Sequence, residues 1–167
     1  MDADIHVWGI GNDIMGDDGV GIFVAKMLRR LSPSNIKVRI CESVPENFIS
    51  ISTMKDIRKL VIVDAAQMSL PPGSMRRISP IEPQSFISTH GLSFLRLLNH
   101  SAKECELIII GIQPAMTGFS TKLSPSVRRA ARELIKMILS GRLCEIPPLT
   151  SLTSLQDSIF LQFRFLQ

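Results

Sequence analysis

Acidic side chains close two apolar runs that lie far apart in the sequence. Asp17 and Asp18 follow the run Ile5–Ile10, and Asp64 ends the run Leu60–Asp64. Short apolar runs bounded by glycine or polar residues are typical of buried strands. Ligands bind beyond the carboxyl ends of strands in open α/β sheets, so we expect these carboxylates at one edge of a sheet. Capping a helix or forming a turn is the alternative role for Asp64.

A cation is the ligand that this arrangement favours. The glycine-rich segment Gly9–Gly19 suggests a dinucleotide site, but Ile14 stands where that fingerprint needs its third glycine. Asp17 and Asp18 occupy the place where a helix N-terminus would bind a phosphate, and two anions repel another. The alternative for either aspartate is capping of the helix that follows.

His90 adds a nitrogen donor to the candidate residues. It starts a predicted helix after Ser88 and Thr89, where capping or surface exposure is the alternative role. His6 lies early in the first strand, at the wrong end for the site, and His100 ends a helix, where a partly protonated imidazole favours the dipole. Two carboxylates and an imidazole suit borderline divalent ions such as nickel, zinc or cobalt.

Strands and helices alternate along the chain in a way that would position these side chains. Further strands are predicted at Val38–Ile40, Met75–Ile78 and Leu107–Gly111, the last followed by Gln113. Helical periodicity is present in segments 18–30, 45–54, 90–99 and 125–140. This alternation predicts an α/β fold, a three-layer sandwich with a mostly parallel central sheet and helices on both faces.

Length and composition limit the classes of protein that the chain can belong to. With 167 residues, of which 45% are hydrophobic and 20% charged, it forms one core, and we assign a domain to residues 1–146. No apolar run is long enough to span a bilayer, and three isolated cysteines predict reduced thiols in a cytoplasm. The net charge of +4 is explained by one basic helix, and aromatic residues to stack bases are scarce, so no nucleic-acid partner is expected.

Two segments at the C-terminal end need separate interpretation. Arg128 and Arg132 lie on the basic side of the last predicted helix, and we interpret this side as a solvated face; a surface that steers an acidic substrate is the alternative. Residues 147–167 form a tail of uncertain role, in which Leu161, Phe163 and Phe165 alternate with polar residues. We expect the tail to be covered by its own domain or by a partner, which includes self-association.

Five segments of the chain, in order and spacing, resemble the nickel–iron hydrogenase maturation endopeptidases. They are Gly9–Gly21, Val44–Phe48, Leu60–Ala65, Ser88–Leu92 and Gly111–Phe119. The last of them is similar to the branch that matures the large subunits of hydrogenase 3-type and archaeal group 4 enzymes. The similarity extends from about Ile5 to Leu139, which is most of the chain.

The resemblance implies a function and a site. Members of this family are hydrolases that remove a C-terminal extension from the hydrogenase large-subunit precursor after nickel has been inserted. The three residues of the family that contact nickel match Asp18, Asp64 and His90, which we assign as both the catalytic and the metal-binding residues. The position of Asp18 is often glutamate in the family, and the shorter side chain leaves Asp17 as an alternative. The resemblance implies no intrinsic cofactor, because the nickel arrives in the substrate.

Two other classes of function compete with this interpretation. A non-catalytic, nickel-dependent assembly chaperone with the same fold would bind the large-subunit precursor without cutting it. A nucleotide-binding α/β enzyme is disfavoured by Ile14 and by the pair Asp17 and Asp18. The roles of the three site residues also stay open, since either carboxylate could act as general base or the nickel could activate water.

Overall fold

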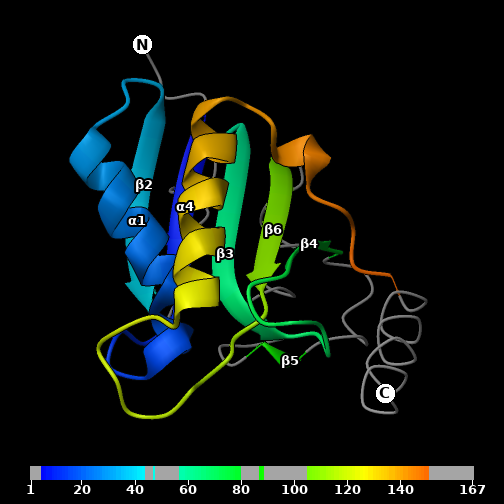
Figure 1. Ribbon diagram of the computed structural model, residues 1–167. Helices are drawn as coiled ribbons and strands as arrows, with labels where there is room; N and C mark the ends of the chain where they lie inside the picture. Colours follow the sequence, from blue (N-terminus) through cyan, green and yellow to red (C-terminus); the bar gives the residue numbers. More distant parts are fainter. Residues whose placement is uncertain (1–4, 44–46, 48–56, 80–86, 89–104, 151–167) are drawn as a thin grey trace.

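The central sheet of the protein is mostly parallel, and two long helices cover one of its faces (Figure 1). The computed structural model describes residues 5–43, 47, 57–79, 87–88 and 105–150. The strands are β1 (Ile5–Ile10), β2 (Ile36–Glu42), β3 (Lys59–Gln67), β4 (Met75–Ile78), β5 (Ile87–Ser88) and β6 (Glu106–Ile112). The helices are η1 (Gly16–Gly19), α1 (Val20–Leu31), α4 (Pro125–Leu139) and η4 (Leu143–Glu145), where η marks a 3₁₀ helix.

The strand order is β2-β1-β3-β6-β4, with β5 paired to the end of β3. The pairs β1–β2, β1–β3 and β3–β6 are parallel, and β4 and β5 run antiparallel to their neighbours. The candidate residues Asp17 and Asp18 follow β1, and Asp64 lies within the carboxyl-terminal half of β3. The carboxyl ends of β1, β3 and β6 and the amino ends of α1 and α4 therefore lie at one edge of the sheet (Figure 1).

Side chains of β3 enter two separate hydrophobic cores. Val61, Val63 and Ala65 belong to the core under α1 and α4, whereas Leu60, Ile62 and Ala66 belong to the core on the opposite face. Both faces of β3 are buried, as expected for the centre of a three-layer α/β fold. Two of the four predicted helices, in segments 45–54 and 90–99, fall almost entirely outside the described residues.

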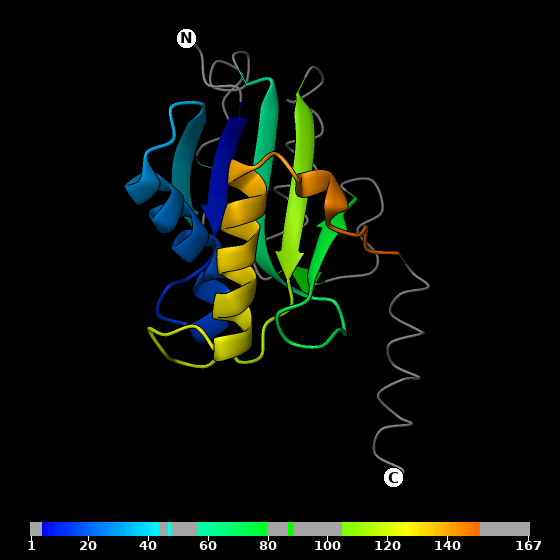
Figure 2. The same ribbon diagram turned by 45° about the horizontal axis from the view of Figure 1, so that its top comes forward.

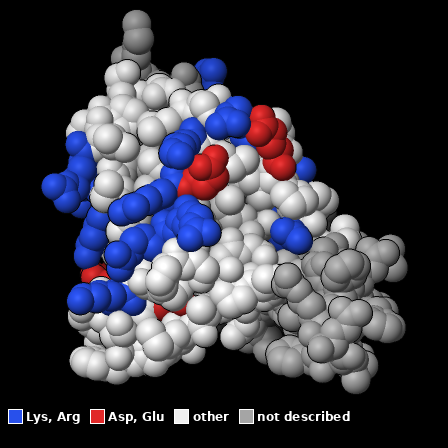
Figure 3. Space-filling model, in the orientation of Figure 1, with Lys and Arg blue, Asp and Glu red and all other residues white. Residues whose placement is uncertain are grey.

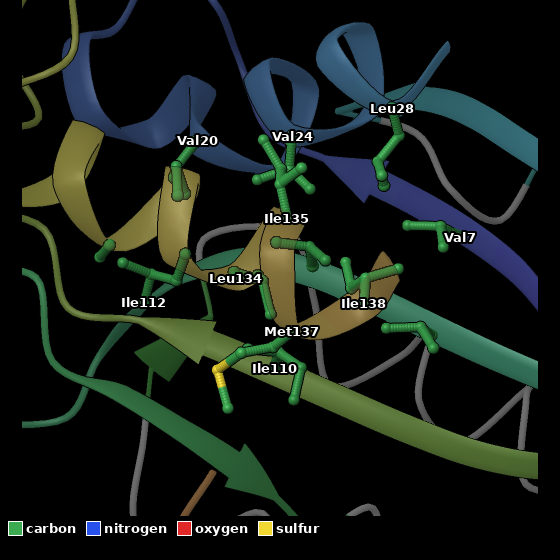
Figure 4. Packing of buried hydrophobic residues seen from close by; sticks show 14 of the residues in the cluster. Val7, Val20, Val24, Leu28, Ile110, Ile112, Leu134, Ile135, Met137 and Ile138 are labelled. Carbon is green, nitrogen blue, oxygen red and sulfur yellow. The ribbon is translucent and has the colours of Figure 1, made fainter. Parts of the chain in front are cut away.

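The helices α1 and α4 bury their apolar faces against β1, β3 and β6, as Figure 4 shows. The start of α4 follows the predicted signal, because the Ser124 side chain accepts a hydrogen bond from the backbone N–H of Val127 and Pro125 occupies the first turn. Gly141, with φ of +69°, follows the end of the same helix. Amphipathic periodicity predicted both α1 and α4, and the signals at Ser124, Pro125 and Gly141 predicted the two ends of α4.

The chain after α4 crosses the sheet and lies beside the outer edge of β4 (Figure 2). The backbone N–H of Arg77 donates to the carbonyl of Pro147 at 2.9 Å, and the N–H of Leu149 donates to the carbonyl of Arg77 at 2.8 Å. The Arg77 side chain adds a hydrogen bond to the carbonyl of Ile146. The beginning of the predicted tail is thus attached to the domain, while residues 151–167 lie outside the described part.

The three cysteines are free thiols, as their isolated positions predicted, and they differ in burial. Burial raises the pKa of the Cys41 thiol to about 12, and burial also raises the pKa of Cys105, whereas Cys144 is exposed. Because the thiolate is the nucleophile, we expect iodoacetamide to label Cys144 first, Cys105 more slowly and Cys41 only after unfolding. Peptide mass spectrometry of the native protein over time checks this order, and early labelling of Cys41 would contradict it.

Within the described residues, no helix is long and apolar enough to cross a membrane.

Candidate functional site

Close backbone contacts hold η1 and α1 against the end of the sheet where β1, β3 and β6 have their carboxyl ends. A Cβ atom on Gly21 would lie 2.2 Å from the carbonyl oxygens of both Ile10 and Val63, and a Cβ on Gly9 would lie 2.1 Å from the carbonyl oxygen of Gly21. Only glycine permits this approach of a helix to two strands. It fixes the first turn of α1 over the ends of β1 and β3, and η1 precedes that turn directly.

Asp18 and Asp64 come from the two elements that meet at this edge. η1 carries Asp18 and packs against β3, which carries Asp64 opposite Gly111 of β6. The two residues are only 5% and 6% exposed. The Asp64 carboxylate accepts a hydrogen bond of 2.8 Å from the backbone N–H of Ala65. Buried carboxylates require partners or ligands, so this pair fits a site for a cation or for acid–base chemistry.

β3 continues past Asp64 to Gln67, whereas the sequence predicted that Asp64 ends the strand. The extra residues are held by β5, whose Ser88 pairs with Ala66 and whose Ile87 pairs with Gln67. Asp64 is therefore an acidic residue inside a paired strand. That setting argues against the turn-forming alternative, because turns lie outside paired strands.

Asp17 has a structural role in holding the loop between β6 and α4. Its carboxylate accepts hydrogen bonds from the backbone N–H groups of Ala115 (2.9 Å), Met116 (2.9 Å) and Ser124 (2.7 Å), and the residue is fully buried. A carboxylate offers about four acceptor positions, and three of them are used here. Asp17 caps neither η1 nor α1. Asp18 is thus the member of the pair that we retain as a site candidate.

Replacing Asp17 by Ala is expected to lower the free energy of unfolding by roughly 2–5 kcal/mol, because three buried N–H groups lose a charged acceptor. Asp13→Ala is the matched control, since Asp13 makes an exposed ion pair with Lys26, and the loss of such a pair should cost less than about 1 kcal/mol. Urea unfolding of both variants provides the measurement. Equal losses would show that the Asp17 hydrogen bonds do not stabilise the fold.

Gln113, the polar residue predicted after the last strand, also has a structural role. Its side-chain oxygen accepts hydrogen bonds from the backbone N–H groups of Met68 (2.7 Å) and Leu70 (3.3 Å), and its amide nitrogen donates to the side chain of Gln67. These contacts join the end of β6 to the connection between β3 and β4. No local sequence signal indicates this role, because the partners are more than 40 residues away.

The third candidate, His90, lies outside the described residues. Among the residues that are described, no three His, Cys, Asp or Glu side chains gather into a group that could hold a metal ion. His6 is in the amino-terminal half of β1, as predicted, and burial followed by the charges of Lys37 and Arg39 lowers its pKa. The structure thus brings together the elements that carry Asp18 and Asp64, whereas the place of His90 in the site stays a prediction.

The sequence of this chain is similar to those of known proteases. A family model described as hydrogenase maturation protease, HycI, matches residues 23–141. The hydrogenase 3 maturation protease of Escherichia coli K12 is 31% identical over 134 residues, which cover 77% of this chain and 85% of the relative. A putative hydrogenase maturation protease of Methanocaldococcus jannaschii is 30% identical over 148 residues, covering 81% and 94%.

The fold is shared with solved structures of such proteases. The solution structure of the endopeptidase HycI from Escherichia coli superposes with a TM-score of 0.77 at 28% identity, covering 90% of this chain and 97% of the other. The crystal structure of a NiFe hydrogenase maturation protease HycI from Thermococcus kodakarensis KOD1 has a TM-score of 0.69 at 25% identity, covering 84% and 92%. Sequence and structure agree that this chain belongs to the hydrogenase maturation protease family.

Proposed function

We propose that this protein is the endopeptidase that removes the C-terminal extension of a nickel–iron hydrogenase large-subunit precursor once nickel has been inserted. As a member of a protease family the chain is a hydrolase with a protein substrate. The observation that carries the specific reaction is the placement of two buried carboxylates, Asp18 and Asp64, where η1 meets β3 at the carboxyl edge of the sheet.

The nickel of the substrate supplies the chemistry in this proposal. Asp18, Asp64 and His90 are the proposed ligands, since oxygen and nitrogen donors suit a nickel ion that is already held by the precursor. The pairing of β5 supports the inclusion of His90, because Ser88, two residues before His90, pairs with Ala66, two residues after Asp64. In this proposal a scissile carbonyl near the ion is polarised or a water is deprotonated; the alternative is that Asp18 or Asp64 acts as the general base.

The proposed enzyme has no resident metal, so that nickel in the precursor acts as a checkpoint. Chelator-treated protein is therefore expected to process nickel-loaded precursor at an unchanged rate. It should bind added nickel, zinc or cadmium weakly, because the proposed donor set lacks a thiolate. Metal analysis after dialysis and a titration calorimetry experiment measure both properties. Stoichiometric nickel that survives chelation would contradict this part of the proposal.

Cleavage itself is tested by mass spectrometry of the precursor. Nickel-loaded and nickel-free precursors are each incubated with the protein, and only the loaded form should lose its C-terminal extension. Stable binding without any loss of mass would support the assembly chaperone instead. A thermal shift with nucleotides would revive the nucleotide-binding alternative, which the family match does not support.

We place the reaction in the cytoplasm, where free thiols such as those of this chain stay reduced. Self-association through the tail of residues 147–167 remains a prediction. It is measured by light scattering of the full chain and of a chain truncated after Pro148.

A further inference from the structure

A groove of about 380 Å³ lies on the helical face of the protein, between the N-terminal parts of α1 and α4. We call it the α1–α4 groove. Ile14, Ile22, Phe23 and Leu123 supply its large apolar side chains. The groove is open to solvent on one side and is lined by residues of four chain segments: the loop after β1, the first half of α1, the loop before α4, and α4 itself.

Positive charge dominates the lining of this groove. Lys26, Lys122, Arg128 and Arg132 contribute to it. Among the described residues, Asp13 is the only acidic one in the lining, and it is paired with Lys26 at 2.7 Å. Figure 3 shows Lys and Arg side chains gathered over α1 and α4. The interpretation of Arg128 and Arg132 as a merely solvated face is therefore incomplete, since both residues line a groove with an apolar floor.

Exposed apolar side chains lie on the two loops beside the groove. Ile14 and Met116 are both 48% exposed and Phe119 is 83% exposed, which is unusual for such large side chains. The loops that carry them are joined by backbone hydrogen bonds from Ser120 to Ile14 (3.0 Å) and from Gly16 to Ser120 (2.7 Å). We call these three side chains the apolar lip. Their position is thus fixed relative to the groove.

The groove and the candidate site share one structural element. Gly16 and Gly19, the two ends of η1, line the groove, and Asp18 lies between them in the same turn. Asp17, also in η1, accepts a hydrogen bond from the backbone N–H of Met116, a member of the apolar lip. A protein segment bound in the groove would therefore run directly past the turn that carries a proposed catalytic residue.

We propose that the α1–α4 groove and the apolar lip form a docking surface for a segment of the protein substrate that carries both carboxylates and large apolar side chains. This docking role rests on the proposed function. Charge complementarity selects the carboxylates, because Lys122, Arg128 and Arg132 line the groove in addition to the Asp13–Lys26 ion pair. The apolar floor and lip select a polypeptide over a nucleic acid, whose backbone offers charge without apolar side chains.

The charged half of the surface is tested with the double variant Lys122→Glu/Arg132→Glu. Both residues are exposed and line the groove. The matched control is Arg29→Glu/Arg30→Glu, which makes the same change of net charge at exposed positions in the last turn of α1, outside the groove. We expect the groove variant to lower kcat/KM for precursor processing by about tenfold or more at low ionic strength, mainly through KM. The loss should shrink as salt is added, and the control should stay within about twofold of wild type.

The apolar half is tested with Phe119→Ser against Leu31→Ser. Both side chains are more than half exposed, but Leu31 lies at the end of α1, away from the groove. We expect Phe119→Ser to raise KM by about fivefold or more, independently of the salt concentration. The reason is that the variant loses the burial of an aromatic side chain against the bound substrate. Both variants should keep the unfolding midpoint of wild type.

The outcomes separate the docking surface from the proposed function. If the wild-type protein leaves nickel-loaded precursor intact, the proposed function fails. If wild type cleaves the precursor and the groove variants match their controls at every salt concentration, the docking inference alone is overturned. Binding of a fluorescent single-stranded oligonucleotide that the groove variant abolishes, with processing unchanged, would replace the protein segment by a nucleic acid as partner.

Discussion

Replacement of Asp64 by Asn is expected to abolish processing of nickel-loaded precursor while the protein stays folded. Asparagine keeps the shape of the side chain and an oxygen that accepts the hydrogen bond from the N–H of Ala65. It removes the negative charge that a nickel ion or a proton would need, and loss of a general base alone costs about 10²–10⁴-fold in rate. The free energy of unfolding should change by no more than about 1–2 kcal/mol. Processing is followed by mass spectrometry, and unfolding by urea titration.

Val61→Asp, in the same strand, is the control for this prediction. Val61 is fully buried in the core under α1 and α4, so that a carboxylate placed there has no partner and should prevent folding. The two substitutions in β3 therefore have different expected effects: Asp64→Asn abolishes processing without unfolding the protein, and Val61→Asp prevents folding. Processing by Asp64→Asn at the wild-type rate would show that the proposed site is wrong.

Gly21→Ala is expected to destabilise the whole domain by about 3 kcal/mol or more, although alanine is the better helix former. The added Cβ would lie 2.2 Å from the carbonyl oxygens of Ile10 and Val63, and both are backbone atoms that cannot rotate away. α1 would have to move off the sheet, which reopens the core that it covers. Since η1 precedes α1, processing activity should fall with stability.

Gly118→Ala provides the matched control for the glycine substitution. No heavy atom lies within 4 Å of a Cβ built at Gly118, so that this change should be close to neutral. Thermal unfolding of the two variants measures the difference. Similar midpoints would indicate that α1 has room to shift and that the contact at Gly21 does not determine its position.

The long helices α1 and α4 and the strands β1, β2, β3, β4 and β6 were predictable because their signals are local, whereas β5 and η4 were not predicted. Runs such as Ile5–Ile10 and the N-cap at Ser124 depend only on neighbouring residues, and each appears in the structure at or near its predicted bounds. The extension of β3 to Gln67 was missed, because Ala65, Ala66 and Gln67 have no strand signal of their own. They are held in a strand by pairing with β5 and β6.

The placement of Asp18 and Asp64 on facing elements followed from sheet topology, which requires only the order of strands and helices. The difference between Asp17 and Asp18 could not be predicted, since the partners of Asp17 lie about 100 residues further along the chain. The role of Gly21 was hidden for the same reason. It depends on two strands that approach one helix, and the glycine-rich segment shows only that some close contact exists.

The segment Ile146–Leu149, which lies beside β4, has a consequence for the solubility of the protein. An open sheet edge is a template on which a second molecule can add a strand, and repeated addition leads to aggregates. Here both backbone groups of Arg77 are already hydrogen-bonded to Pro147 and Leu149. The covering segment is itself a poor template, because Pro147 and Pro148 have no N–H groups to offer. Two consecutive prolines thus protect the β4 edge of the sheet from edge-to-edge association at Arg77.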